Sequence, residues 1–296
     1  MANALRAHAK KVLPESVRTP VRMLEIYFKR LLVWPMILLQ VRGEHLLDQL
    51  KLIASAFAAP VLSLRNLDRW DDPVLLFDTA VVVGGVGRFR LRRWCDDLWH
   101  VLPWREPTVL KFIRDTLKPG DVFVDAGANV GVYSVAAAKL VGNRGHVIAV
   151  EMMPDTAARL RKHLAFNAAE QVHVVERALS DDADQVLIAR VPEGRFGQAS
   201  IASARVNDAG LRSLSVTTTT LARLLDGIAR VALMKMDIEG AELQALRGAG
   251  ALIRRVEAVI FESWADSCGV AEYLLSMGYD VRRLDGRNWV AVRCPR

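Results

Sequence analysis

The sequence predicts an α/β protein built on a mostly parallel sheet, with a C-terminal antiparallel hairpin and an N-terminal helical extension. From residue 104 onward, short apolar runs alternate with helical segments of about ten to fifteen residues, the pattern of a parallel sheet covered by helices on both faces. Near the end of the chain, two alternating runs flank Asp285-Gly286, which is a strong hairpin signal. A chain of 296 residues is long enough for one sizeable domain plus an extension, or for two small domains.

The alternating region gives the individual elements. We expect helices at 104–117, 132–142 and 154–167, and strands at 122–127, 146–151, 172–179 and 256–263. A further strand, an acidic turn and a helix follow one another within 231–253. Residues 180–220 lose this rhythm and predict extra strands around a loop rich in glycine and serine.

The first hundred residues differ in character, and we divide the chain into residues 1–100 and 101–296. The apolar run 31–41 contains Pro35 and is too short to span a membrane, which takes about twenty residues. Residues 44–59 predict a helix that stops before Pro60. This part of the sequence fits a helical pair packed on the C-terminal domain or on a second subunit. It also fits a peripheral membrane contact through residues 21–60, and the oligomeric state stays open.

Composition excludes several classes of protein. The net charge of +7 is a mild basic excess, but no interleaved basic and aromatic platform accompanies it, so we expect no nucleic-acid partner. Three widely spaced cysteines predict neither a zinc site nor a disulfide framework. With no signal-peptide pattern at the N-terminus, we expect a cytoplasmic protein, and a membrane-peripheral location stays open.

The stretch DVFVDAGANVG, residues 121–131, ends a strand and opens onto a ligand loop. Asp125 ends the strand, Gly127 and Gly131 allow a sharp turn, and Glu151 ends the next strand twenty residues later, where an acid holds ribose hydroxyls. The dinucleotide pattern GxGxxG fails at Asn129 and at Val132, which argues against NAD. The spacing instead matches D-x-G-x-G-x-G, the loop of class I S-adenosylmethionine methyltransferases. Asn129 replaces the middle glycine and tolerates a left-handed backbone.

These features lie within a resemblance to the FkbM family of methyltransferases, which extends over about residues 104–263. Its landmarks are REPTVLKFI (105–113), PGDVFVDAGANVGVYS (119–134), VIAVEMMPDTAARLRKHLAFN (147–167), ALSD (178–181), TTTTLARLL (217–225), MKMDIEGAELQALRGA (234–249) and VIFES (259–263). The resemblance implies a class I, Rossmann-like fold with a seven-stranded sheet, and O-methylation of a sugar, glycolipid or other small molecule by S-adenosylmethionine. The chain departs from the family at Met152-Met153-Pro154, where proline more often follows the acid directly.

The resemblance also implies the cofactor site. The residues expected at the methionine end are Asp125, Gly127, Ala128, Asn129, Gly131, Ser134 and Asp237. Glu151 is expected to hold the ribose, and Asn167 to support the loop. Near the adenine we expect Ala178 and Leu179, with Asp181 or a nearby backbone N–H on its ring nitrogens or amine.

Candidate catalytic residues lie at the ends of the later strands: Lys235, Asp237, Glu239 and Glu262. Lys235 and Asp237 are two apart on a strand, so their side chains share a face, and Lys235 fits either catalysis or a salt bridge that orients an acid. As a general base, Asp237 would need a raised pKa. Alternatively, Asp237 and Glu262 could hold Mg²⁺. Glu239 also fits a purely structural role at a helix start.

The acceptor is the least defined part of the prediction. The loop 192–204 carries the glycines and small polar residues of a flap, and Arg195, Phe196 and Ser200 within it could contact an acceptor. Two other functions stay open: an N-methyltransferase, whose amine acceptor needs less deprotonation, and a non-catalytic nucleotide-binding scaffold. We interpret Glu242 as part of a solvated helix face.

Overall fold

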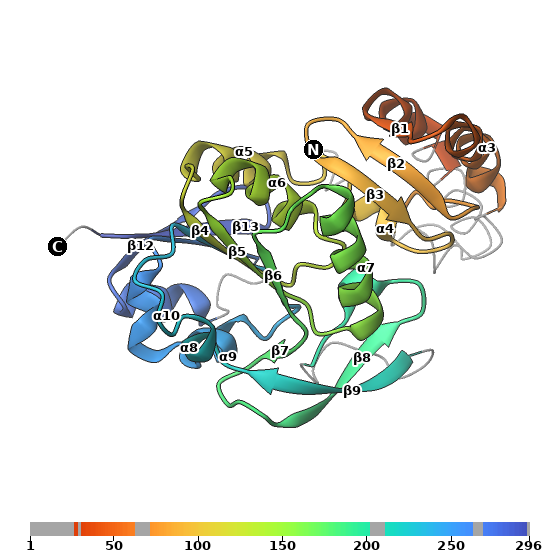
Figure 1. Cartoon of the computed structure of the whole chain (residues 1–296). Helices are drawn as coiled ribbons and strands as arrows, with labels where there is room; N and C mark the ends of the chain where they lie inside the picture. The colour runs from red at the N-terminus through yellow and green to blue at the C-terminus, as the bar shows by residue number, and fades with distance from the viewer. Residues whose placement is uncertain (1–26, 29–30, 63–71, 202–210, 263–268, 295–296) are drawn as a thin grey trace, which may run out of the picture. The chain divides into compact units, whose positions relative to one another are not determined.

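The structure, a computed structural model, describes residues 27–28, 31–62, 72–201, 211–262 and 269–294 (Figure 1). By their internal contacts these residues form two units. The first comprises Met1–Val82 and Arg90–Leu102, and the second comprises Val83–Phe89 and Pro103–Arg296. The candidate site is assembled in the second unit.

A seven-stranded sheet forms the centre of the second unit, with the order β12-β13-β11-β10-β4-β5-β6. Its strands are β4 (Val122–Ala126), β5 (His146–Val150), β6 (Val172–Val175), β10 (Leu233–Met236), β11 (Ala258–Glu262), β12 (Tyr279–Arg283) and β13 (Asn288–Arg293). Strand β4 pairs in parallel with β5 and β10, while β13 is antiparallel to both of its neighbours. The prediction of a mostly parallel sheet with a C-terminal antiparallel hairpin is therefore confirmed.

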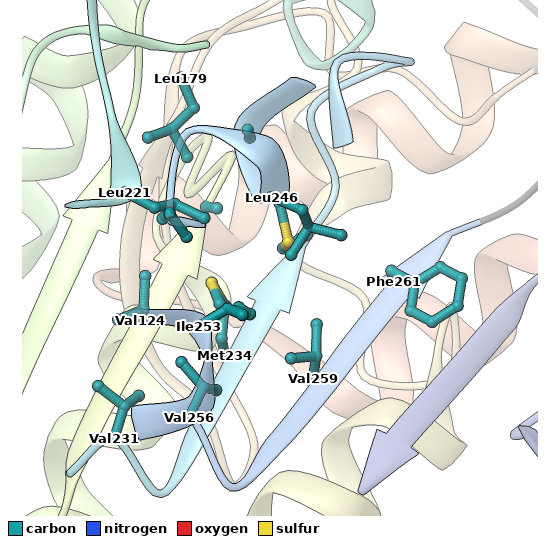
Figure 2. Packing of buried hydrophobic residues seen from close by; sticks show 14 of the residues in the cluster. Val124, Leu179, Leu221, Val231, Met234, Leu246, Ile253, Val256, Val259 and Phe261 are labelled. Carbon is teal, nitrogen blue, oxygen red and sulfur yellow. The ribbon is translucent and has the colours of Figure 1, made fainter. Parts of the chain in front are cut away.

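Apolar clusters cover both faces of this sheet, because successive strand residues point to opposite sides. Val124 and Met234 belong to one cluster, and their chain neighbours Phe123 and Leu233 belong to the other. Figure 2 shows the first cluster, in which Leu246 and Ile253 lie against the strands. The helical segments are α5 (Pro107–Thr116), α6 (Val132–Val141), α7 (Pro154–Phe166), α8 (Leu221–Leu224), α9 (Glu242–Arg247), the 3₁₀ helix η3 (Gly250–Arg255) and α10 (Val270–Ser276).

The predicted strand at 172–179 is wrong in one respect, because it is two strands in two sheets. After β6 the chain leaves the large sheet, and β7 (Ala178–Leu179) pairs in parallel with β9 (Leu211–Thr219). Strand β8 (Val186–Pro192) pairs antiparallel with β9, and η2 (Phe196–Gln198) follows β8. The side chains of β6 are partly exposed at the sheet edge, whereas Ala178 is buried in the core of the smaller sheet, so burial favours the switch.

The N-terminal elements are a helical segment at 31–40, β1 (Val41–Gly43), α3 (Leu46–Leu62), β2 (Thr79–Val83), β3 (Gly87–Leu91) and α4 (Asp97–His100). The three strands form a sheet of order β1-β2-β3, and a turn that contains Gly85, with a φ of 72°, joins β2 to β3. Helix α3 does not stop before Pro60 as expected but continues to Leu62. Proline removes one backbone donor, and with two residues left in the helix that loss is small. Among the described residues, no helix has the length and apolarity needed to cross a membrane.

Candidate functional site

The loop between β4 and α6 is shaped by two glycines and an asparagine with positive φ. Gly127 has a φ of 83°, and a Cβ there would lie 2.0 Å from the carbonyl oxygen of Asp237. Gly131 has a φ of 92°, and its Cβ would lie 2.4 Å from Cδ1 of Leu160. Asn129, between them, has a φ of 48°. The loop thus brings bare backbone against the end of β10, which a side chain at Gly127 would prevent.

Beneath this loop, Asp125 is completely buried at the end of β4. Its Oδ2 accepts a hydrogen bond of 2.6 Å from Oγ of Ser134, in the first turn of α6. Its Oδ1 has no hydrogen-bond partner. Burial raises the pKa of Asp125, and the nearby charge of Lys235 and the Ser134 hydroxyl oppose that rise. A buried carboxylate oxygen without a hydrogen-bond partner is uncommon, and it marks Asp125 as a candidate site residue.

Glu151, just after β5, connects its strand end to the same loop. Its Oε2 accepts the backbone N–H of Asn129 at 2.9 Å, and its Oε1 accepts that of Met153 at 2.8 Å. Both carboxylate oxygens therefore have fixed positions. The side-chain Oδ1 of Asn129 is buried without a hydrogen-bond partner, so a second unused acceptor lies in this loop.

A pocket of about 50 Å³ lies over these strand ends. Seven of the predicted site residues line this pocket: Gly127, Asn129, Glu151, Ala178, Leu179, Asp237 and Glu239. Sequence reasoning missed Met152, Arg177, Ile238 and Ala241, which also line it. The segment after β8 contributes Phe196, Ala199 and Ile201, and Oγ of Ser200 donates a hydrogen bond of 2.8 Å to the carbonyl oxygen of Glu239. Pockets for ligands of ordinary size have volumes of roughly 300–1,000 Å³. This pocket is smaller, and the segment after β8 forms part of its wall.

Two carboxylates leave the ends of adjacent strands beside the pocket. Met236 pairs with Phe261 in the register of β10 and β11, so Asp237 and Glu262, the next residues, lie next to each other. Their side chains share a hydrogen bond. Nζ of Lys235, a buried side chain, lies 3.2 Å from Oδ2 of Asp237. The pair and the ammonium therefore form one charged cluster.

The electrostatics of this cluster follow from burial and from like charges. Burial first, and then the charges of Asp237, Glu106 and Glu239, raise the pKa of Glu262 to about 8. Two hydrogen-bonded carboxylates thus retain one proton between them near neutral pH. Burial lowers the pKa of Lys235, but the surrounding acids outweigh that effect and raise it above its usual value. Lys235 stays charged and compensates the remaining negative charge.

Three further side chains belong to this cluster and were missed by sequence reasoning: Glu106, Tyr133 and Asn288. The hydroxyl of Tyr133 donates a short hydrogen bond to Glu106, and Nδ2 of Asn288 lies 3.4 Å from the other oxygen of Glu106. Nζ of Lys235 lies 4.6 Å from the centre of the Tyr133 ring. Arg105, beside Glu106, reaches that carboxylate at 3.4 Å. A charged pair directly before Pro107, at the start of an amphipathic helix, was the available signal.

Other predicted site residues lie outside the pocket lining, among them Asp125, Gly131, Ser134, Lys235 and Glu262. Ala128 donates its backbone N–H to the carbonyl of Val150 at 2.9 Å, within the loop framework. The amide of Asn167 is engaged by the backbone of Arg88, accepting at 2.9 Å and donating at 2.8 Å. Asp181 is exposed and accepts a hydrogen bond of 3.1 Å from Oγ of Ser180.

Glu242 requires a correction, because it is buried rather than on a solvated helix face. Its Oε1 accepts the backbone N–H groups of Ile238 and Gly240, at 3.1 and 3.2 Å. Without Glu242 these donors, which lead into the start of α9, would lack an acceptor, and a negative charge is stabilised at a helix start. Glu242 therefore holds the acidic turn in which Glu239 adopts a φ of 52°.

The Asp237 and Glu262 pair does not fit a Mg²⁺ ion. Mg²⁺ takes octahedral oxygen coordination, whereas Asp237 already faces the ammonium of Lys235 and shares a hydrogen bond with Glu262. In the described part of the chain, three metal-binding side chains meet at Cys95, Asp96 and Asp97, in the first unit. There Arg92 binds both oxygens of Asp97, and His100 lies 3.2 Å from Asp96.

Comparison with known proteins bears on the same residues. Residues 125–281, more than half of the chain, match the methyltransferase FkbM domain family. A hexuronic acid methyltransferase, AglP, of Haloferax volcanii is 25% identical over 186 residues, covering 62% of this chain and 72% of that protein. Two solved structures resemble the chain weakly. A methyltransferase FkbM from Methylobacillus flagellatus KT has a TM-score of 0.40 at 17% identity, covering 66% of this chain and 53% of that one. A precorrin-6y C5,15-methyltransferase from Geobacter metallireducens GS-15 has a TM-score of 0.41 at 16% identity, covering 65% and 89%.

Proposed function

The chain belongs to the FkbM family of methyltransferases, and from this premise we propose that it methylates a hydroxyl of a sugar, glycolipid or related metabolite with S-adenosylmethionine. The observation that carries the choice of a hydroxyl is the carboxylate pair of Asp237, which lines the pocket, and its neighbour Glu262. An alcohol must lose its proton as it is methylated, so a proton acceptor is needed there. An amine acceptor would need no such pair, and this favours O- over N-methylation.

The residues around the pocket fit S-adenosylmethionine. Its ammonium is a cation that the unpaired acceptors Asp125 Oδ1 and Asn129 Oδ1 suit, and no phosphate requires a glycine at residue 129. We assign the methionine end to the loop 125–131, the ribose to Glu151, and the adenine to the surface of Ala178 and Leu179. When bound, S-adenosylmethionine supplies a methyl group on a positively charged sulfur.

The remaining chemistry belongs to the side chains at the strand ends. We assign the Asp237 and Glu262 pair as acceptor of the hydroxyl proton. This proton moves to a carboxylate oxygen of the pair while the hydroxyl oxygen of the acceptor gains the methyl group. Lys235, 3.2 Å from Asp237, offsets the negative charge of the pair before the transfer. Ser134 and Tyr133 act as positioning residues, because each hydrogen-bonds an acid of the cluster, Asp125 and Glu106 respectively.

A sugar is the acceptor class that the comparisons favour, since the name of the Haloferax relative gives a hexuronic acid as its substrate. A uronic acid carries its own carboxylate, which the Asp237 and Glu262 pair would repel unless a cation faced it. Arg177 lines the pocket and is exposed, so it is our candidate for that cation. A panel of neutral sugars and uronic acids, with wild type and Arg177→Ala, tests this assignment.

The decisive experiment separates cofactor binding from chemistry. Isothermal titration with S-adenosylmethionine and with NAD should give binding of the first and none of the second. Incubation with methyl-deuterated S-adenosylmethionine and a panel of glycans and glycolipids should then give products carrying the label, found by mass spectrometry. Glu262→Gln should slow labelling roughly 10²–10⁴-fold and keep cofactor binding, while replacing Glu170, an exposed acid on the surface, with glutamine should change neither. Failure to bind S-adenosylmethionine would refute the proposal.

A further inference from the structure

Helix α3 exposes most of its large apolar side chains, although Leu52 is buried. Leu46 and Phe57 are each 78% exposed, and Leu47, Leu50 and Val61 are also exposed. These positions recur at helical spacing and form one stripe along the helix. The buried side of the same helix carries mainly small residues, among them Ser55, Ala56 and Ala59.

The polar side chains of α3 explain why apolar residues lie on its outer side, because they accept hydrogen bonds from backbone N–H groups inside the first unit. Asp48 accepts the backbone N–H of Ala80 at 3.2 Å, and Gln49 accepts that of Gly43 at 2.7 Å. Oγ of Ser55 accepts the N–H of Leu76 at 3.0 Å. The inner side of α3 is therefore held by hydrogen bonds to other segments of the unit, and these bonds fix the orientation in which Leu46, Leu47 and Leu50 face outward.

The helical segment 31–40 has the same character. Trp34 and Ile37 are buried, whereas Leu32 is 72% and Leu39 is 79% exposed, and Met36 between them is also exposed. Residues 31–40 contain no charged side chain. We call these exposed side chains on the two helices the apolar surface: Leu31, Leu32, Met36, Leu39, Leu46, Leu47, Leu50, Phe57, Val61 and Leu62. An exposed apolar set of this extent marks an interaction site.

The charge of the surrounding sequence points to the kind of partner. Residues 1–62 contain nine lysines and arginines against four acids, so five of the seven net positive charges of the chain lie there. Basic residues next to an exposed apolar helix are attracted to anionic lipid headgroups, each by about 1 kcal/mol near the membrane surface. A second copy of the chain would instead bring the same basic excess against itself, which is repulsive.

We propose that the apolar surface binds the face of an anionic lipid bilayer, with α3 and the segment 31–40 lying in the interface. The leucines and Phe57 of the apolar surface enter the boundary of the acyl chains, and the basic excess of residues 1–62 adds attraction to the anionic headgroups. This inference rests on the first unit alone and does not depend on the reaction of the second.

Sedimentation of the full chain with lipid vesicles tests the proposal. Wild type should pellet with vesicles of phosphatidylcholine mixed with phosphatidylglycerol, should pellet much less with phosphatidylcholine alone, and should be released by high salt. Leu39→Glu and Phe57→Glu should each weaken binding roughly ten-fold or more, because an inserted apolar side chain is lost. The matched control is Val186→Glu, which changes a 68% exposed valine of β8 in the second unit and should bind as wild type does.

Four results would overturn the proposal, the fourth of them from thermal melting. The first is no pelleting of wild type with anionic vesicles at low salt, and the second is equal pelleting of wild type and both glutamate variants. The third is a dimer in gel filtration that Leu39→Glu dissociates without any vesicle binding, because the apolar surface would then join two copies. Thermal melting of each variant completes the test: a lower melting temperature in Leu39→Glu and Phe57→Glu but not in Val186→Glu would show that the surface packs within the chain.

Discussion

Glu151 accepts the backbone N–H of Asn129 at 2.9 Å, so the end of β5 holds the loop that leaves β4. The other oxygen of the same carboxylate accepts the N–H of Met153. Each oxygen keeps lone pairs that these bonds do not use. One side chain can therefore fix the loop and still receive ribose hydroxyls.

Replacing Glu151 with alanine should weaken cofactor binding and the fold together. A buried N–H group at Met153 and a partly buried one at Asn129 lose their acceptor, at up to about 1–3 kcal/mol for each unsatisfied group, and the dissociation constant for S-adenosylmethionine should rise ten-fold or more. Glu151→Gln keeps one acceptor oxygen, so its stability and its affinity for the cofactor should lie between those of wild type and Glu151→Ala. Urea unfolding and isothermal titration measure the two effects. Unchanged affinity in Glu151→Ala would remove this residue from the cofactor site.

Gly127→Ala should be much more damaging than alanine at another glycine of similar backbone conformation. Gly127 has a φ of 83° and Gly120 a φ of 93°, but a Cβ at Gly127 would lie 2.0 Å from the carbonyl oxygen of Asp237, and one at Gly120 meets nothing within 4 Å. Gly120→Ala should cost about 1–2 kcal/mol of unfolding free energy for its left-handed backbone. Gly127→Ala should cost clearly more, because the strand end must also move. Equal losses in urea unfolding would mean that the close approach is unimportant.

The sheet was predictable because its signals are local. Alternation of apolar strands and helical segments, and the turn at Asp285-Gly286, each lie within a few residues of sequence. The loop was predictable for the same reason, down to the left-handed backbone of Asn129. The division of 172–179 into two strands was not, because it depends on which sheet buries Ala178, and that is a tertiary property.

The acid cluster shows the same limit at the site. Lys235 and Asp237 are two residues apart, so their ion pair could be foreseen from the strand period. Glu106, Tyr133 and Asn288 come from three distant segments and meet through folding alone. The exposure of Glu242 was predicted wrongly because an acid near a helix start is usually solvated. Here the acidic turn folds back over the side chain and donates two N–H groups to it.

The carboxylate pair predicts a definite pH dependence of turnover. The pKa of Glu262 is raised to about 8 by burial and by its acidic neighbours, and the pair accepts a proton best once it is fully ionised. The rate of methyl transfer at saturating substrates should rise with pH below about 8 and level off above it. Glu262→Gln should lower the rate roughly 10²–10⁴-fold and remove this rise. A wild-type rate independent of pH over the same range would contradict the assignment.

The raised pKa of Glu262 has the opposite effect on stability: turnover should rise with pH, whereas the free energy of unfolding should fall. The folded protein binds the proton of Glu262 more tightly than an unfolded chain with the ordinary pKa of 4.5 does. The resulting stabilisation is complete below about pH 4.5 and is lost as the pH rises through about 8. Glu262→Gln has no charge to bury, so its unfolding free energy relative to wild type should improve as the pH increases. Urea unfolding at a series of pH values checks this, and a constant difference would indicate a carboxyl with an ordinary pKa.

Ser200 should control access to the pocket. The cavity of about 50 Å³ is smaller than a cofactor needs, and the segment with Phe196 and Ile201 lines it. Oγ of Ser200 ties this segment to the carbonyl oxygen of Glu239, a bond worth about 1 kcal/mol. Ser200→Ala should therefore speed both association and release of S-adenosylmethionine, roughly five-fold, with a smaller change in affinity. Stopped-flow binding measures the two rates, and Ser276→Ala, whose hydroxyl bonds its own helix at Tyr273, serves as control. If Ser200→Ala changed affinity without changing the association rate, the hydroxyl would be a contact to the bound cofactor, because a tether that limits entry must alter the rate of entry.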